Sequence, residues 1–417
     1  MAERSRRLAY VYHPSSFPTL TLAEAATPLA ELVWVVDRSL PATETMCPLL
    51  ARLGEVVDIA GLSPADAADV VAAVEPDGIV TFADARLEIT AQIAERLGLP
   101  FISRESAISL TDKHAQRRAL AAGGVAVPRS CLAPALEDEA AWRQLAAQIG
   151  FPAVLKPRVG EGSRDTYKVC SLAEARACAA AATAGRPERP LVLEEYLADA
   201  TGRREDGFGG YVSVECVAIE GVITPVAITG RFPPAEPFRE TGFFIPHALA
   251  PAEAEEVVAC ACQAARAVAM TIGCMHIEIK LTPAGPRVIE VNGRLGGGIP
   301  EMLSDAAGVD LYDVAYRLAL GERPAVPAMV ACNEVGWLLY VHAPDWMSRV
   351  VEVDGLEELS RHPAVREVLL NRRPGESVDW REGNHGHVFS VRGVARDHDQ
   401  VRALARHVEE TVLIKGD

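Results

Sequence analysis

The stretch VIEVNGRLGGG, residues 288–298, decides the fold. It places Glu290, Asn292 and Arg294 at alternate positions, so in a strand their side chains share one face. Three consecutive glycines follow at 296–298, where bare backbone can approach a ligand closely. An acid, an amide and a guanidinium on one face of such a strand indicate a polar binding site.

A second stretch, HIEIKL at 276–281, has the same two-residue period, and the connector TPAGP has the composition of a turn. Its polar face consists of His276, Glu278 and Lys280, and its apolar face of Ile277, Ile279 and Leu281. A hairpin centred on Ala284 sets Glu278 opposite Glu290, and His276 opposite Asn292. The apolar face of the hairpin then also includes Ile289 and Val291.

Opposed side chains in such a hairpin have Cβ atoms roughly 4.5–5.5 Å apart, so two facing carboxylates repel unless a cation lies between them. Glutamate and asparagine oxygens suit Mg²⁺, which fills its shell with water and substrate phosphates. Arg294, the next residue on the same face of the strand, would bind the same phosphates through two N–H groups. The alternative is a solvated polar face of an edge hairpin. Pro300 is expected to open the next helix.

The composition limits the partners of the chain. With 417 residues, 49% of them hydrophobic, the chain is long enough for two or three packed units. Its formal charge of −16 disfavours nucleic acid as a partner. The N-terminal MAERSRRLAYVYHP has no apolar signal core, and the apolar run 257–275 is interrupted by Gln263 and Arg266, so we expect a buried helix there and no membrane span.

Nine cysteines with no CxxC pair and no regular spacing indicate reduced thiols and a cytoplasmic protein, rather than disulfides or a zinc site.

The first hundred residues alternate strand and helix patterns, which predicts a small parallel α/β sheet. The expected strands are LAYVYH (8–13), LVWVVD (32–37), GIVTFA (78–83) and PFIS (100–103), with a helix over 85–98. No G-x-G-x-x-G follows the first strand, so we expect a Rossmann-like unit that binds no dinucleotide by itself.

The next segment, SLTDKHAQRRALAAGGVAVP (109–128), predicts a helix ending at Gly123 and Gly124. In FPAVLKPRVGEGSRDTYKV (151–169), a strand delivers Lys156, and a second strand leaves after the glycine-rich loop. The loop residues Gly160, Gly162 and Ser163 could cover phosphates, or could form an ordinary hairpin turn. A lysine inside an apolar strand needs a partner, and a nucleotide phosphate would supply one.

Further along, PLVLEEYLADA (190–200) predicts a strand, TGRREDGFGG (201–210) a loop, and YVSVECVAIEGVITPVAITGR (211–231) two strands about a turn at Glu220 and Gly221. The segment from about 331 ends in a helical pattern at 398–412 and suggests a small α+β cap. HGH at 385–387 could ligate a metal, although a polar hairpin is the simpler interpretation.

Taken together, TDK, FPAVLKP, GEGS, LEEYL, HIEIK and IEVNGRLGG resemble the ATP-grasp superfamily, and within it the carboxylate-amine ligases that include the L-amino acid ligases. The resemblance implies an ATP-grasp fold of α/β and α+β class. It implies a Rossmann-like pre-ATP-grasp domain at 1–108, an ATP-grasp domain at 109–325 and a C-terminal α+β subdomain at 326–417. Within the ATP-grasp domain, a lid is expected at about 125–197 and a larger catalytic part at about 198–325.

The same resemblance implies roles for individual residues. Lys113 and Lys156 would bind ATP phosphates, and the adenine hinge would consist of Glu194, Glu195, Tyr196 and Leu197. Glu278, Glu290 and Asn292 would hold two Mg²⁺ or Mn²⁺ ions. Catalysis would rest on Arg294, Lys156 and Glu290. The substrate would face Arg231, Glu240, His276, Arg294 and Gly297, although His276 could equally be a structural histidine.

The implied reaction phosphorylates a carboxylate, preferably that of an amino acid, to an acyl phosphate. A neutral amine then attacks the acyl phosphate, which gives an amide or dipeptide with ADP and phosphate. Such chemistry needs positioning and charge neutralisation more than a protein nucleophile. Small molecules are then the partners, and a homodimer is expected by analogy. The alternatives are a carboxylase-type enzyme acting on bicarbonate and a catalytically inert ATP-binding regulator.

Overall fold

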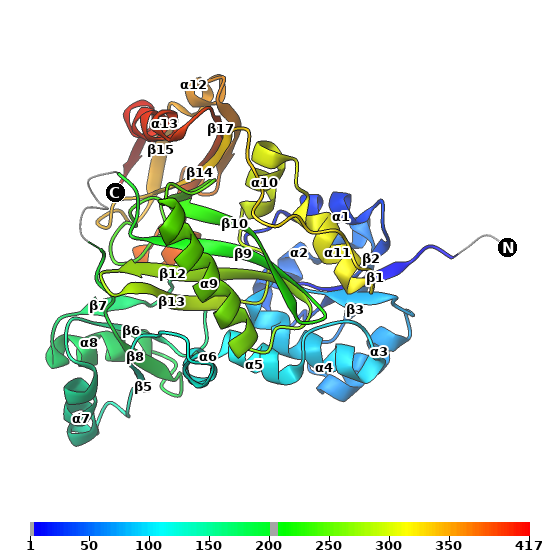
Figure 1. Ribbon diagram of the computed structural model, residues 1–417, viewed down its shortest axis with the longest axis horizontal. Coiled ribbons are helices and arrows are strands. Elements are labelled where there is room, and N and C mark those ends of the chain that lie inside the picture. The colour runs from blue at the N-terminus through cyan, green and yellow to red at the C-terminus, as the bar shows by residue number, and fades with distance from the viewer. Residues whose placement is uncertain (1–3, 201–206) are drawn as a thin grey trace.

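A computed structural model describes residues 4–200 and 207–417 of the chain. Its centre is an eight-stranded antiparallel sheet of order β13-β12-β9-β10-β11-β14-β17-β16 (Figure 1). These strands are β9 (Tyr211–Ile219), β10 (Val222–Arg231), β11 (Gly242–Ile245), β12 (Gly273–Thr282), β13 (Gly285–Asn292), β14 (Val335–His342), β16 (Val365–Leu370) and β17 (His387–Ala395). The predicted turn between β9 and β10 is present, and both of its residues have positive φ, as a tight hairpin requires.

The β12–β13 hairpin has the predicted pairs, Glu278 with Glu290 and His276 with Asn292. The geometry that produces these pairs differs from the expected one. The turn is one position tighter than assumed, because Thr282 pairs with Gly285, and a bulge at Ile289 restores the register. Ile289 therefore leaves the apolar face, where the buried Val288 takes its place.

One face of the central sheet is covered by helix α9 (Pro251–Ala267), as Figure 1 shows. Its buried Val257, Ala261 and Ala264 pack in the same cluster as Ile277 and Val291. The helix is shorter than the predicted span 257–275, because that apolar run is shared between α9 and the start of β12 at Gly273. No helix in the described part of the chain is long and apolar enough to cross a bilayer.

The N-terminal unit is the predicted parallel sheet, of order β3-β2-β1-β4. It contains β1 (Arg7–Val11), β2 (Glu31–Val36), β3 (Glu55–Asp58), β4 (Gly78–Val80), α1 (Thr19–Ala26), α2 (Pro41–Leu53), α3 (Pro64–Ala72), the short η1 (Asp84–Arg86) and α4 (Leu87–Leu97). One predicted strand is absent and one observed strand was not predicted. PFIS forms no strand and leads instead into α5 (Arg104–Thr111), and the short strand β3 was not expected.

The helix predicted from 109 to its end at Gly123 and Gly124 is two helices, because Asp112 ends α5 and caps α6 (Lys113–Ala122), whereas the predicted end is present. The Asp112 carboxylate accepts hydrogen bonds from the backbone N–H groups of His114 (2.9 Å) and Ala115 (3.1 Å). The break places Lys113 at the first position of α6 with its side chain turned inward.

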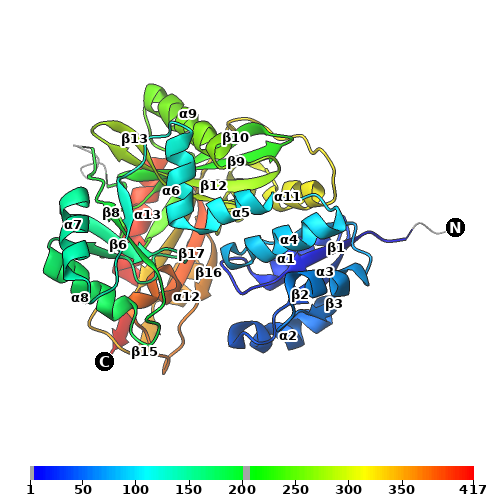
Figure 2. The ribbon, with the colours of Figure 1, turned by 90° about the horizontal axis from the view of Figure 1, so that it is seen from below.

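A third, four-stranded sheet lies within the range expected for the lid and has the order β5-β8-β6-β7. Its elements are β5 (Ser130–Leu132), β6 (Ala153–Pro157), β7 (Tyr167–Val169) and β8 (Leu191–Glu195), with α7 (Glu139–Ile149) and α8 (Leu172–Ala182). Figure 2 shows α7 and α8 at one end of the molecule and the N-terminal helices at the other, with α6 between them. Most of the loop predicted at 201–210 lies outside the described residues.

The C-terminal segment is joined to the rest by backbone pairing, and does not merely pack against it. Strand β14 pairs with β11, so β14, β17 and β16 continue the central sheet. The remaining elements are α10 (Ile299–Ala307), α11 (Leu311–Ala319), β15 (Val350–Asp354), α12 (Leu356–Ser360), η3 (Trp380–Gly386), α13 (His398–Thr411) and β18 (Leu413–Gly416). Pro300 stands in the first turn of α10, as predicted.

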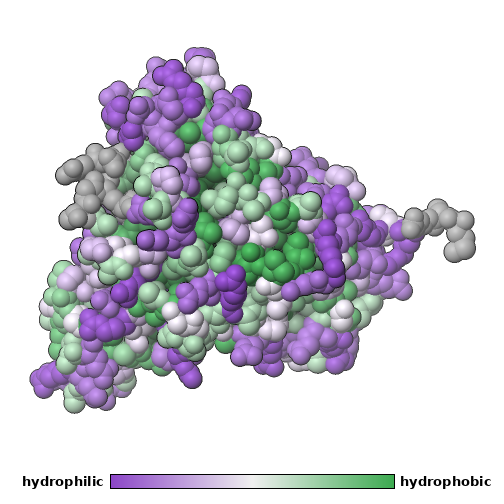
Figure 3. Space-filling view, viewed as in Figure 1, coloured by the Kyte–Doolittle hydropathy of each residue, from purple (hydrophilic) through white to green (hydrophobic). Residues whose placement is uncertain are grey.

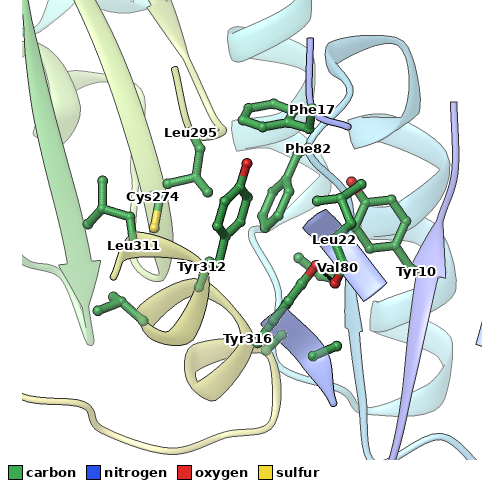
Figure 4. Close-up of a cluster of buried hydrophobic side chains, with 14 of the residues drawn as sticks. Tyr10, Phe17, Leu22, Val80, Phe82, Cys274, Leu295, Leu311, Tyr312 and Tyr316 are labelled. Atoms are coloured by element: carbon green, nitrogen blue, oxygen red, sulfur yellow. Dashed lines mark hydrogen bonds between the residues drawn. The ribbon is translucent and has the colours of Figure 1, made fainter. Parts of the chain in front are cut away.

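A cluster of buried aromatic side chains joins the N-terminal unit to α11 (Figure 4). Phe82 stacks on Tyr316 with ring centroids 5.7 Å apart, and Phe17 lies 5.4 Å from Phe82 and 6.2 Å from Tyr312. The apolar area buried here fixes the N-terminal loop at 13–18 and η1 beside the central sheet. Figure 3 shows the face that carries α9, with hydrophilic side chains toward the ends of the molecule and hydrophobic ones toward its middle.

Candidate active site

A cavity of about 1000 Å³ lies where the polar face of the hairpin, the four-stranded sheet, the N-terminal loop and the C-terminal segment meet. Such a volume is at the upper end of the range for ligand pockets. All of the predicted site residues line it: Lys113, Lys156, Gly160, Gly162, Ser163, Glu194, Glu195, Tyr196, Leu197, Arg231, Glu240, His276, Glu278, Glu290, Asn292, Arg294 and Gly297. The tertiary structure thus brings together residues up to 184 positions apart, from 113 to 297.

Lys156 and Glu194 form a buried ion pair on adjacent strands β6 and β8, with Nζ 2.7 Å from Oε2. Arg117 on α6 donates to both oxygens of the same carboxylate, at 2.9 and 3.0 Å. Burial alone would raise the pKa of Glu194, but Arg117 and Lys156 lower it to about 2. Both oxygens of Glu194 are engaged by cations of the protein itself. The Glu194 side chain therefore positions Lys156 and has no free oxygen for contact with the adenine base.

Lys113 links the glycine-rich loop to the hairpin. Its Nζ lies 2.8 Å from Glu290 Oε1 and donates to the Gly160 carbonyl oxygen at 2.6 Å. The loop itself turns through positive φ at Gly162 and at Ser163, which backbone approach to a ligand commonly requires. Lys113 and Lys156 are both buried.

The facing pair Glu278 and Glu290 meets the chemical requirement for a magnesium site. Burial would raise the pKa of Glu278, but the His276 imidazole (Nε2 to Oε1, 3.7 Å), Arg231 and Arg294 lower it to about 2, so it is a carboxylate at neutral pH. Asn292 donates its amide N–H to the His276 carbonyl oxygen at 3.2 Å, which leaves its amide oxygen as the acceptor for a cation. Two carboxylates and one amide oxygen fit Mg²⁺ with phosphate and water completing its shell.

Arg294 is held by a carboxylate of the N-terminal unit. Its Nε and NH2 donate to Asp84 Oδ2 at 3.0 and 2.8 Å, and its NH1 donates to the Leu295 carbonyl oxygen at 3.0 Å. Of the five N–H groups of a guanidinium, these contacts use three and leave two for a ligand. Burial raises the pKa of Asp84, and Arg294 opposes that shift. The second oxygen of Asp84 is buried without a hydrogen-bond partner.

Arg231 and His276 belong to a buried network that the sequence did not indicate in full. Arg231 forms an ion pair with Glu240 and donates to Ser213 Oγ at 3.1 Å. Its NH2 lies 2.9 Å from His276 Nε2, and His276 Nδ1 lies 2.9 Å from Glu215 Oε2. Burial lowers the pKa of His276, but Glu215 more than offsets this and raises it.

Both ring nitrogens of His276 are therefore engaged by protein groups, which favours the structural interpretation of this residue. Glu215 itself accepts from Ser213 Oγ (2.9 Å) and Thr229 Oγ1 (3.0 Å) and is almost fully buried. In the same network, Arg231 Nε is buried without a hydrogen-bond partner.

Two further lining residues, Glu195 and Tyr196, contact cations of the protein. Glu195 pairs with Arg129, and Tyr196 lies beneath the Lys168 ammonium, 4.5 Å from the ring centroid. His385 and His387 of the HGH motif also line the cavity, and burial lowers the pKa of both. The described residues contain no cluster of three or more His, Cys, Asp or Glu side chains arranged to hold a metal. All nine cysteines are free thiols.

Three residues that contact the predicted site residues were missed, namely Asp84, Arg117 and Glu215. Glu215 stands in an apolar strand, as Lys156 does, so the same signal could have found it. Arg117 lies one helical turn after Lys113, which places both on one face of α6. Asp84 is the first residue of the short η1 after strand β4, and no local pattern connects it with Arg294.

Comparisons with known proteins agree with this architecture. Residues 149–301 match the model of the ATP-grasp domain, and residues 34–101 match that of the ATP-grasp N-terminal domain. Over its whole length, the chain superposes on the crystal structure of the L-amino acid ligase from Bacillus licheniformis with a TM-score of 0.81 and 19% identity, covering 100% of both chains. The chain belongs to the ATP-grasp superfamily.

Within that superfamily, its sequence relatives include ligases and synthases. It is 28% identical to carnosine synthase 1 of Mus musculus and 27% identical to the alanine–anticapsin ligase of Bacillus subtilis strain 168, over 60% and 53% of this chain. It is 30% identical over 82% of its length to the uncharacterized protein y4rH of Sinorhizobium fredii. The chain spans 66% of y4rH, 32% of the carnosine synthase and 49% of the alanine–anticapsin ligase.

Proposed function

We propose that the protein is an ATP-dependent, ADP-forming ligase that joins a carboxylate, most simply that of an amino acid, to an amine. The observation that carries the proposal is the pair Glu278 and Glu290, which face each other beside Asn292 in one cavity with Lys113, Lys156 and Arg294. The names of the relatives support the amide-forming branch of the superfamily.

In this proposal, Glu278, Glu290 and Asn292 would hold one or two magnesium or manganese ions, which neutralise phosphate charge when bound. Lys113 and Lys156 bind the ATP phosphates under the loop at 160–163. The hinge at 195–197 borders the adenine, with Glu194 holding Lys156 in place. The two N–H groups of Arg294 that its protein partners leave available bind the phosphoryl group being transferred.

The reaction then follows two balanced steps. A carboxylate oxygen of the substrate attacks the γ-phosphorus and ADP leaves, which gives an acyl phosphate. The amine nitrogen attacks the acyl carbon, phosphate leaves with the electron pair of the broken C–O bond, and the nitrogen loses its proton. Arg231, Glu240 and the backbone at Gly297 line the part of the cavity where we place the organic substrate. His276 contacts Arg231 through Nε2 and helps to hold it in place. His276 is not proposed as the general base that deprotonates the amine.

The alternative of an inert ATP-binding regulator is disfavoured by the same charges. Lys156, Glu278, Glu290 and Arg294 are all present, all line one cavity and are each held by at least one partner. Maintaining buried charges costs free energy, which a protein without catalytic need for them has no reason to spend. A homodimer and a cytoplasmic location stay predictions.

The decisive experiment measures phosphate release from ATP and Mg²⁺ with single amino acids and then pairs, followed by mass spectrometry of each mixture that responds. We expect one amide per ADP formed. Glu290→Ala should abolish turnover, whereas the matched control Glu256→Ala, on the exposed face of α9, should not. Absence of ATP binding, or amide formation that persists in Glu290→Ala, would overturn the proposal.

A further inference from the structure

The C-terminal segment 380–387, which includes the HGH motif, lies directly on the glycine-rich loop of the four-stranded sheet. The backbone N–H of Asn384 donates to the Gly162 carbonyl oxygen at 2.8 Å. At Gly383, where φ is +64°, an added Cβ would stand 2.1 Å from that same oxygen. The approach is therefore possible only because residue 383 has no side chain.

The loop shows the complementary feature. At Gly162, where φ is +63°, an added Cβ would lie 2.7 Å from His385 Nε2, so the imidazole packs against bare backbone. Beyond the loop, Tyr167 on β7 meets Trp380 edge-on, with ring centroids 6.3 Å apart. Gly162 and Gly383, which are distant in the sequence, thus pack closely together, and the first histidine of HGH lies against the loop.

The side chain of Asn384 connects this contact to the predicted substrate residues. Its Nδ2 donates to Glu240 Oε2 at 2.8 Å, and the Glu240 backbone N–H donates to Asn384 Oδ1 at 2.8 Å. The other oxygen of Glu240 pairs with Arg231, and His342 donates to the Glu240 carbonyl oxygen at 2.7 Å. One residue therefore bonds to the loop through its backbone and to the Arg231–Glu240 pair through its side chain.

We propose that Asn384 is a positioning residue that couples occupancy of the Arg231–Glu240 subsite by the carboxylate substrate to closure of the loop at 160–163 over the ATP phosphates. The inference rests on the proposed function. A loop that closes over ATP before the acid has arrived would trap water as the phosphoryl acceptor. Closure excludes water and completes the site, so linking it to the second substrate suppresses ATP hydrolysis. Glu240 and Asn384 are hydrogen-bonded to each other. The acid would contact this pair at Glu240 and the loop contacts it at Asn384, so binding at one end can affect the other.

Two variants test separately the contact of Asn384 with Glu240 and the contact of segment 380–387 with the loop. Asn384→Ala removes both side-chain hydrogen bonds to Glu240 and keeps the backbone bond to Gly162, at a half-buried position that tolerates truncation. Gly383→Ala introduces a Cβ against the loop. Asn333→Ala, an exposed position outside the cavity, is the matched control.

The first measurement is hydrogen–deuterium exchange of residues 158–166 with the Mg²⁺ complex of a non-hydrolysable ATP analogue. It needs no ligase turnover. We expect exchange in Gly383→Ala to be at least about fivefold faster than in the wild type and in Asn333→Ala. Equal protection in all three proteins would show that the loop does not depend on this contact and would overturn the inference, even if amide formation had been demonstrated.

The second measurement is the Kd of the same analogue with and without the amino acid that serves as the carboxylate substrate. In the wild type the acid should tighten the analogue by at least about fivefold, the low end of typical coupling between sites. In Asn384→Ala this tightening should vanish, with the Kd in the absence of acid unchanged within twofold and more phosphate released per amide. Full tightening in Asn384→Ala would refute the coupling while leaving the proposed ligase intact.

Discussion

Neutralising Glu194 should destabilise the protein far more than the same change at the next residue. Glu194→Gln leaves Arg117 and Lys156 buried without a counter-charge, at side-chain exposures of 6% and 9%. Removing one partner of a buried ion pair costs about 3–5 kcal/mol, because the remaining charges are uncompensated. Glu195→Gln breaks only the pair with Arg129, whose side chain is 60% exposed, and should cost at most about 1 kcal/mol.

Thermal and urea unfolding of the two variants measures this difference. For a unit of 150–250 residues, about 3–5 kcal/mol corresponds to a fall in Tm of roughly 6–20 °C. Glu194→Gln should also weaken ATP binding, because Lys156 loses the carboxylate that orients it. Equal shifts in the two variants, or a shift below about 1 kcal/mol for Glu194→Gln, would refute the assignment of Glu194 as the buried anchor of Lys156.

Three further predictions follow from the same contacts. Because the pKa of Glu194 falls from 4.5 to about 2 on folding, its contribution is fully present above pH 4.5 and is lost as the pH falls. The difference in unfolding free energy between wild type and Glu194→Gln should therefore narrow by about 2 kcal/mol from pH 5.5 to pH 3, and a constant difference would contradict the shifted pKa. Asp84→Asn should lower kcat by about 10²-fold with little change in the KM for ATP, because Arg294 loses its orientation, and steady-state kinetics that match the wild type would exclude this role. Glu215→Ala should cost about 3 kcal/mol in urea unfolding, because Ser213, Thr229 and His276 lose a shared buried acceptor, and a cost below 1 kcal/mol would mean that water replaces it.

Much of the fold could be predicted because its signals are local. The β12–β13 pairing followed from two polar faces of period two joined by a short turn, although a bulge at Ile289 compensated for the misjudged turn length. The errors occurred where a pattern was ambiguous. The apolar run at 257–275 is divided between a helix and a strand, and periodicity alone cannot locate that boundary. At Asp112 the side chain caps a new helix inside one continuous helical pattern.

The sequence by itself determined which side chains carry charge, which of them share a strand face and that their chemistry suits phosphate and magnesium. The tertiary structure alone decided how those charges are held. Asp84 lies 210 positions from Arg294, and Asn384 lies 144 from Glu240, so no periodicity relates the members of either pair. Their meeting depends on the aromatic cluster that fixes the N-terminal unit and on the pairing of β11 with β14, which continues the central sheet into the C-terminal segment. Packing and sheet pairing act between residues distant in sequence, and for that reason they are visible only in three dimensions.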